Sequence, residues 1–311
     1  MSFPVLPPTE PGEVLLICTC YDDGKPLWGD LLDEVDGRRE GDVILLSEGE
    51  VRLRAAEKAG WSYLHGGNVP ALVPDGGHAA PVAVLADIPV AYGGAEPLLV
   101  DLAEVPGRGV RVPAHRVGEI LAGLLGGAVR FEDLVREMDK RGLYQGDAGR
   151  PAFPAPEPPG RRSFPPLPAS SAGLLVRTCF DDEEGWRALL DDLGGPDGDG
   201  EVGADLDPDE IDPDNYPLEA RVVEDRRYEG LLPGEVPALV PREPHATMVA
   251  LADARTFAEA DRPLTAVDLY ETPGQPAVVP FRVAGSMECN LSISNMDFHS
   301  FVLEEGVDPW W

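Results

Sequence analysis

The chain has few of the residues that usually build reaction centres. Its 311 residues include only five histidines and four cysteines. The signatures HExxH, GxSxG and Walker A are all missing. We therefore expect no cofactor, and the sequence favours a non-enzymatic role.

Basic residues and long apolar runs are also scarce. There are 25 Lys and Arg against 56 Asp and Glu, a formal net charge of −31. Such a surface repels the phosphates of nucleic acids. No apolar run approaches the ~20 residues that a membrane-spanning helix needs, and the first residues lack the basic and apolar regions of a secretory signal. We expect a cytoplasmic protein that binds neither nucleic acid nor membranes.

What the chain does have is an internal duplication. The sequence Thr-Cys-Tyr-Asp-Asp at residues 19–23 returns as Thr-Cys-Phe-Asp-Asp at residues 178–182. The hexapeptide at residues 69–74 is repeated letter for letter at residues 236–241. The two halves of the chain are therefore expected to share one fold.

The repeats also predict the domain boundaries. A first, degenerate domain covers residues 13–145 and a second covers residues 172–311, each long enough to bury its own core. A Pro-rich leader, residues 1–12, precedes them, and a Pro-rich linker, residues 146–171, joins them. Eight prolines fall between residues 151 and 168, which is typical of a semi-rigid polyproline spacer.

Apolar segments follow the same order in both halves. A strand-like run is followed by a helical pattern and another strand, and then three strand-like runs come close together before the final helices. In the first half these three runs are residues 82–85, 98–102 and 110–112. This order predicts an α/β fold with α+β character, in which a mixed, mainly antiparallel sheet packs against helices.

Acidic charge is concentrated in the second half. Residues 1–150 contain 14 basic and 24 acidic residues (−10), and residues 151–311 contain 11 and 32 (−21). Residues 194–215 form an acidic insertion with seven Asp, two Glu and no basic residue, which we interpret as solvated. Such a charge attracts a basic protein, so an acidic interaction protein, in one form an immunity-like inhibitor, is the favoured function. The simpler alternative is that the charge only maintains solubility.

Aspartates near the ends of predicted strands suggest a second function. If they met at one edge of the sheet they could hold Mg²⁺, as in an enzyme that acts on a phosphorylated small molecule. An antiparallel neighbour would place its aspartate on the opposite edge, however, and helix caps or turns explain the same residues. The metal-binding candidates are Asp181, Asp182, Asp253 and Asp268.

A polar segment near the C-terminus suggests a third function. Residues 290–298 are rich in Asn and Ser where the first copy, at residues 123–131, has almost no polar side chains. This difference predicts a small-ligand binding site in the second copy. The alternative is that Ser294 or Asn295 caps a helix beginning near Met296. The ligand- or partner-binding candidates are Asn290, Ser292, Asn295, Asp297 and His299.

Four segments of the second half, residues 174–178, 249–256, 267–269 and 290–298, carry a family resemblance. They resemble an actinobacterial domain family of unknown function, number six-nine-two-four. The resemblance extends over nearly all of the second half and more faintly over the first, so it implies two tandem copies of the domain. It implies no activity.

Overall fold

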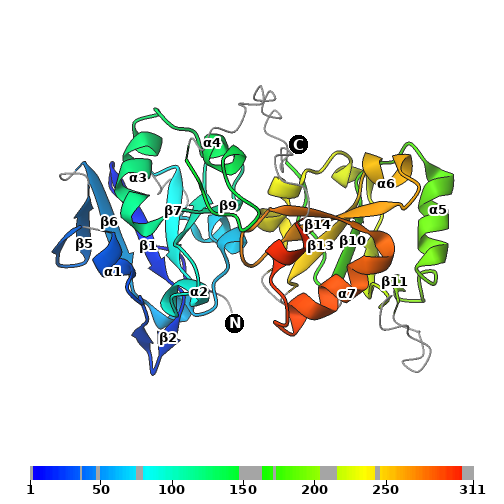
Figure 1. Cartoon of the computed structure of the whole chain (residues 1–311), viewed down its shortest axis with the longest axis horizontal. Helices are drawn as coiled ribbons and strands as arrows, with labels where there is room; N and C mark the ends of the chain where they lie inside the picture. The colour runs from blue at the N-terminus through cyan, green and yellow to red at the C-terminus, as the bar shows by residue number, and fades with distance from the viewer. Residues whose placement is uncertain are drawn as a thin grey trace. The chain divides into compact units, whose positions relative to one another are not determined.

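Each half of the chain folds around its own mixed β-sheet (Figure 1). The computed structural model describes residues 3–35, 37–46, 50–74, 80–146, 163–170, 173–203, 216–241 and 246–302. Two compact units are present, Met1–Ala155 and Pro156–Trp311. Residues 147–162 of the predicted linker and residues 204–215 of the acidic insertion lie outside the described residues.

The first unit contains nine strands, four α-helices and four three-ten helices among its described residues. The strands are β1 Glu13–Cys18, β2 Tyr21–Asp22, β3 Lys25–Pro26, β4 Arg38–Glu40, β5 Val43–Leu46, β6 Val51–Ala56, β7 Val82–Ala86, β8 Leu98–Asp101 and β9 Gly109–Arg111. The α-helices are α1 Leu31–Glu34, α2 Ile88–Ala91, α3 Val117–Leu125 and α4 Phe131–Arg136. The three-ten helices are η2 Ala59–Trp61, η3 Gly66–Asn68, η4 Pro70–Leu72 and η5 Ala114–Arg116.

The second unit repeats this order with longer helices. Its strands are β10 Gly173–Arg177, β11 Glu201–Val202, β12 Ala220–Val223, β13 Met248–Ala252, β14 Pro263–Asp268 and β15 Pro276–Pro280. Its α-helices are α5 Glu183–Asp192, α6 Ala254–Ala258 and α7 Phe281–Ser292. Its three-ten helices are η6 Arg226–Tyr228, η7 Pro233–Glu235, η8 Pro237–Leu239 and η9 Phe298–Phe301.

The two sheets have the same topology at their centres. In the first unit the order is β4-β5-β6-β1-β7-β8-β9, and β1 runs parallel to both β6 and β7. In the second unit the order is β11-β12-β10-β13-β14-β15, and β10 runs parallel to both β12 and β13. The remaining pairs are antiparallel. The predicted mixed, mainly antiparallel sheet packed with helices is confirmed.

Both faces of the central strands are buried, as their continuous apolar sequences indicate. In the second unit, Leu175 of β10 belongs to a core that includes Trp186 and Leu189 of α5 and Met287 of α7. Successive side chains of a strand point to opposite faces of the sheet. Leu174, the neighbour of Leu175, therefore belongs to a second hydrophobic core on the other face. Helices therefore cover one face, and turns and three-ten helices cover the other.

A short Pro-rich segment packs on the second face in each unit. Leu6 in the first unit and Leu167 in the second are both 2% exposed. The backbone N–H of Leu6 donates to the carbonyl of Leu72 at 2.9 Å, and that of Leu167 donates to Leu239 at 2.8 Å. Residues 163–170, part of the predicted spacer, are thus docked on the second unit in the way that the leader docks on the first.

An aromatic side chain fixes this segment in both units. Nε1 of Trp61 donates to the carbonyl of Pro4 at 2.9 Å, and the hydroxyl of Tyr228 donates to the carbonyl of Pro166 at 2.8 Å. We expect Tyr228→Phe to lower the free energy of unfolding by about 1 kcal/mol, because one partly buried hydrogen bond is lost. Urea denaturation would measure this change. Tyr216→Phe is the control, since Tyr216 is an exposed tyrosine, and an equal effect of both substitutions would contradict the docking role.

Two features of the first unit differ from expectation. The helical pattern that follows the first strand-like run forms only α1, which is four residues long. Strand β6 was not predicted, because Arg52 and Arg54 interrupt its apolar residues; they form ion pairs with the fully buried carboxylate of Glu13 instead. Among the described residues, no helix is both long and apolar enough to cross a bilayer.

Candidate functional site

The carboxyl ends of the three parallel strands form one edge of each sheet, which we call the parallel edge. It comprises residues 19–30, 57–63 and 87–96 in the first unit, and residues 178–182, 224–230 and 253–259 in the second. In open α/β sheets ligands commonly bind outside the carboxyl ends of the parallel strands. This edge is therefore the first place to compare with the predicted sites.

The four metal-binding candidates do not meet at this edge. Asp181 and Asp182 follow β10, and Asp253 follows the parallel strand β13, so these three lie at the parallel edge. Asp268 ends β14, which is antiparallel to β13, and pairs with Met248 at the start of β13. Asp268 therefore lies at the opposite edge. Within the described part of the chain, no group of three or more His, Cys, Asp or Glu side chains is arranged to hold a metal ion.

Two of these aspartates begin helices. Oδ1 of Asp182 accepts the backbone N–H of Gly185 at 2.8 Å at the start of α5. Oδ1 of Asp253 accepts the N–H groups of Arg255 and Thr256 at 2.9 and 3.2 Å at the start of α6. Both are N-caps, which satisfy donors that a helix leaves free in its first turn. The alternative interpretation of these residues, as caps, describes their contacts.

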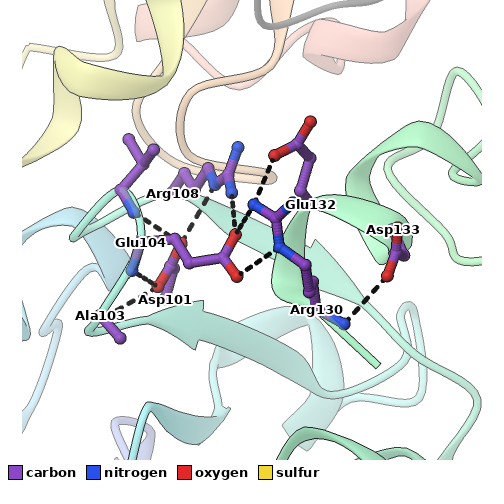
Figure 2. A network of polar contacts seen from close by, with 8 residues as sticks. Asp101, Ala103, Glu104, Arg108, Arg130, Glu132 and Asp133 are labelled. Carbon is purple, nitrogen blue, oxygen red and sulfur yellow. Dashed lines mark hydrogen bonds and ion pairs between the residues drawn. The ribbon is translucent and has the colours of Figure 1, made fainter. Parts of the chain in front are cut away.

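Asp268 shapes a buried turn, and so does its repeat counterpart Asp101. The carboxylate of Asp101 accepts three consecutive backbone N–H groups, those of residues 103–105, at 2.8–2.9 Å (Figure 2). The carboxylate of Asp268 accepts those of residues 270–272 at 2.6–3.2 Å. Gly107 and Gly274 close the two turns with positive φ of 95° and 91°, a conformation that glycine adopts at little cost.

The first unit adds two arginines to this turn. Arg108 is 1% exposed; its Nε donates to Asp101 at 3.2 Å, and its guanidinium lies 5.5 Å from the ring of Phe131. Glu104 lies between Arg108 and Arg130, with N···O distances of 3.4 and 3.2 Å (Figure 2). The carboxylates of the turn are thus matched by buried or half-buried cations.

The second unit has no guanidinium in the corresponding positions. At the same spacing from the turn, Gln275 replaces Arg108, Asp297 replaces Arg130 and His299 replaces Glu132. Burial, followed by the charge of Glu271, raises the pKa of Asp268 to about 7, although its three backbone donors favour the charged form. The same turn is therefore held by a charged pair in one copy and by a carboxyl group that titrates near neutral pH in the other.

The polar segment of the second copy separates into two groups. Nδ2 of Asn290 donates to the carbonyl of Ser286 at 2.7 Å, and Nδ2 of Asn295 donates to Oδ1 of Asn290 at 2.6 Å. The hydroxyl of Ser292 donates to the carbonyl of Cys289 at 2.9 Å. These three side chains close the C-terminal end of α7, where Ser294 has a positive φ of 55°.

The other two candidates lie beside the Asp268 turn. Nδ1 of His299 is 3.6 Å from Oε2 of Glu271 and 3.9 Å from the carboxylate of Asp297. The five candidates therefore do not form one site. The predicted helix near Met296 is also wrong: η9 begins at Phe298, without a side-chain cap from Asp297.

Sequence analysis missed a buried arginine at the parallel edge of the second unit. Arg177 is 1% exposed, and its Nη1 donates to Glu183 at 2.9 Å and to Glu224 at 2.8 Å. Its guanidinium lies 4.6 Å from the ring centre of Phe180 and 5.2 Å from that of Trp186. The hydrogen bond from Arg177 holds the pKa of Glu183 below its ordinary range. Arg177 thus ties β10 to α5 and to the end of β12.

The first unit has a cysteine in the place of Arg177. By strand register, Cys18 corresponds to Arg177 and Glu57 to Glu224. Burial raises the pKa of the Cys18 thiol to about 11, so it stays protonated at neutral pH and is a poor nucleophile. Glu57 accepts Nε1 of Trp28 at 3.2 Å instead. The parallel edges of both units therefore have a glutamate at this position. Its hydrogen-bond donor is Trp28 in the first unit and Arg177 in the second.

A family model described as Domain of unknown function (DUF6924) matches residues 13–147 and again residues 172–309. The chain belongs to this family. The matches cover both units, so the protein is a tandem pair of DUF6924 copies, as the internal repeats predicted. No curated protein and no solved structure matches the chain.

The two DUF6924 copies agree in their turns and differ in the charges around them. Both units have the turn held by an aspartate, Asp101 or Asp268, and the glutamate at the parallel edge, Glu57 or Glu224. Both also have the docked Pro-rich segment. The residues that differ, such as Cys18 against Arg177, sit at equivalent backbone positions. Cys18 and Arg177 directly precede the repeated segments 19–23 and 178–182, so alignment of the two repeats would have identified Arg177 as a changed position.

Proposed function

We propose that this protein is a non-enzymatic interaction protein of the cytoplasm that binds a basic protein, with an immunity-like inhibitor as one form of that role. The observation that carries the proposal is an excess of carboxylates on the surface. The chain has 56 acidic against 25 basic residues. On and around α5, Asp181, Glu184 and Asp191 are exposed, and within the described residues none of them forms an ion pair.

The polar groups singled out in the sequence also support this proposal. Asp182, Asp253 and Asp268 bond to backbone N–H groups, and Asn290 and Asn295 bond to each other. These side chains stabilise local structure. The exposed carboxylates, in contrast, remain available to a partner whose lysines and arginines would complement them.

Salt dependence tests the proposal. The partner should be sought by affinity capture at about 10 mM salt and identified by mass spectrometry. Its association rate with the purified protein should fall at least tenfold when the ionic strength rises from about 10 to 150 mM, because the screening length falls from about 30 to 8 Å. Surface plasmon resonance would measure this rate.

A variant that lacks two of the exposed carboxylates tests their contribution to the association rate. Glu184→Gln with Asp191→Asn should slow association several-fold and leave dissociation nearly unchanged, since rim charges act mainly on the encounter. Glu119→Gln in the first unit is the control, because Glu119 already pairs with Arg116. A captured partner that is not basic, or an association rate that does not depend on salt, would refute the proposal.

A further inference from the structure

One backbone position with a positive φ is occupied by a tyrosine in the first copy and by a glycine in the second. The N–H of Tyr63 donates to the carbonyl of Thr19 at 2.9 Å, and the N–H of Gly230 donates to the equivalent carbonyl of Thr178 at 2.8 Å. Both residues have a positive φ, 62° for Tyr63 and 72° for Gly230. This conformation suits glycine, whereas a tyrosine pays a steric cost there. The first copy therefore keeps a large side chain where the fold favours none.

The tyrosine ring does not recover this cost by packing. Tyr63 is 64% exposed, while its neighbours Trp61 and Leu64 are 4% and 2% exposed. A side chain that is held in a strained conformation and points to solvent stabilises the fold little. Strained residues of this kind are concentrated at functional sites.

A second exposed tyrosine lies at the same edge. Tyr92, 75% exposed, ends α2, which follows β7, the parallel neighbour of β1. The loop at Gly29 packs against the backbone of α2, with the carbonyls of Val90 and Ala91 closest to it. In Figure 1, α2 and the β2 hairpin lie at the same end of the first sheet. The second unit has Glu259 at the end of the corresponding helix α6, so the tyrosine pair is specific to the first copy.

The charge around these rings is negative. The three segments of the parallel edge in the first unit contain six carboxylates and two lysines. Asp87 pairs with Arg111 and Glu57 with Arg39, whereas Asp22, Asp23 and Asp30 are exposed. The face of an aromatic ring attracts cations, and neighbouring carboxylates add to this attraction. An arginine side chain offers both a charge and a planar surface that stacks on tyrosine.

We infer that Tyr63 and Tyr92, the tyrosine patch, form the short-range contact of the protein with its partner and bind arginine side chains of a basic protein segment. The inference rests on the proposed function and deepens it. The net negative charge brings the basic partner to the surface, and the tyrosine patch retains it. Charge should therefore govern the association rate, and the patch should govern the dissociation rate.

A double substitution tests the tyrosine patch. Tyr63→Gly takes the residue that the second copy has, and Tyr92→Ala removes the other ring. Fluorescein-labelled octa-arginine and octa-lysine are the probes, and fluorescence anisotropy measures their affinity for the full-length chain. Octa-arginine should bind the variant roughly tenfold more weakly than the wild type, because each ring contributes a factor of about three to the affinity. The affinity for octa-lysine should fall by a smaller factor.

The matched control removes two exposed tyrosines from the second unit, Tyr216→Ala with Tyr270→Ala. It should change the octa-arginine affinity by less than about twofold. The melting temperature of Tyr63→Gly alone should stay the same or rise, because glycine relieves the strained φ, so weaker binding cannot be ascribed to unfolding.

The outcomes separate the two proposals. If the wild type binds octa-arginine and the tyrosine-patch variant binds it equally well, the patch inference is wrong and the proposed function stands. If the tyrosine-patch variant and the control lose affinity equally, the patch inference is likewise wrong. If the wild type binds neither peptide at about 10 mM salt, both proposals fall.

Discussion

Asp101→Ala should be one of the most destabilising single substitutions in the first unit. It removes the acceptor of three backbone N–H groups and leaves Arg108 buried without its closest carboxylate. Removing one partner of a buried ion pair costs about 3–5 kcal/mol. Hydrogen exchange of the β8 and β9 amides, measured by mass spectrometry, should show this loss of protection.

The second copy supplies the comparison. Asp268→Ala removes the same three backbone bonds, but Gln275 stands where the first copy has Arg108, so no buried guanidinium is left behind. The expected cost is about 1–3 kcal/mol. Equal losses of protection in β8 and β14 would show that Arg108 contributes nothing to the difference between the two turns.

Asp268 should also make the stability of the second unit depend on pH. Its pKa in the folded protein is about 7, against about 3.9 in an unfolded chain. Between these values the folded state holds a proton that the unfolded state releases, so stability is greatest below about pH 4 and falls as the pH rises toward 7. The slope is about 1.4 kcal/mol per pH unit over this range, and stability no longer changes from this source above it.

Asp268→Asn isolates this contribution, because an amide does not titrate. Urea denaturation at pH 5, 6, 7 and 8 should show the wild type gaining stability relative to the variant as the pH falls below 7. Hydrogen exchange of β14 and β15 would assign the change to the second unit. A difference that stays constant across this range would mean that Asp268 is ionised throughout.

The architecture followed from the sequence because the duplication and the apolar periodicity are both local signals. Segments 82–85 and 98–102 were recognised as strands from continuous apolar residues, and they pair as antiparallel neighbours. Strand β6 was not predicted, because its arginines form ion pairs with Glu13. Glu13 is distant from β6 in the sequence, so this contact cannot be seen in the local pattern. Charged residues inside a strand cannot be interpreted without their partners.

The candidate sites were harder to predict for a similar reason. The type of residue at 181, 182, 253 and 268 suits a metal, but the direction of β14 decides whether the aspartates meet. The importance of Tyr63 is also invisible in the sequence, since it arises from a backbone angle. In both cases the decisive quantity is geometric, and residue type alone does not contain it.

The docked Pro-rich segments have a practical consequence for anyone who wishes to divide this protein. The second family match begins at residue 172, yet Leu167 is buried in the core and Pro166 accepts the hydroxyl of Tyr228. A fragment that starts at residue 172 would expose this apolar surface and is expected to aggregate. A fragment intended to fold should begin before Ser163, so the autonomous folding unit is longer than the homologous domain.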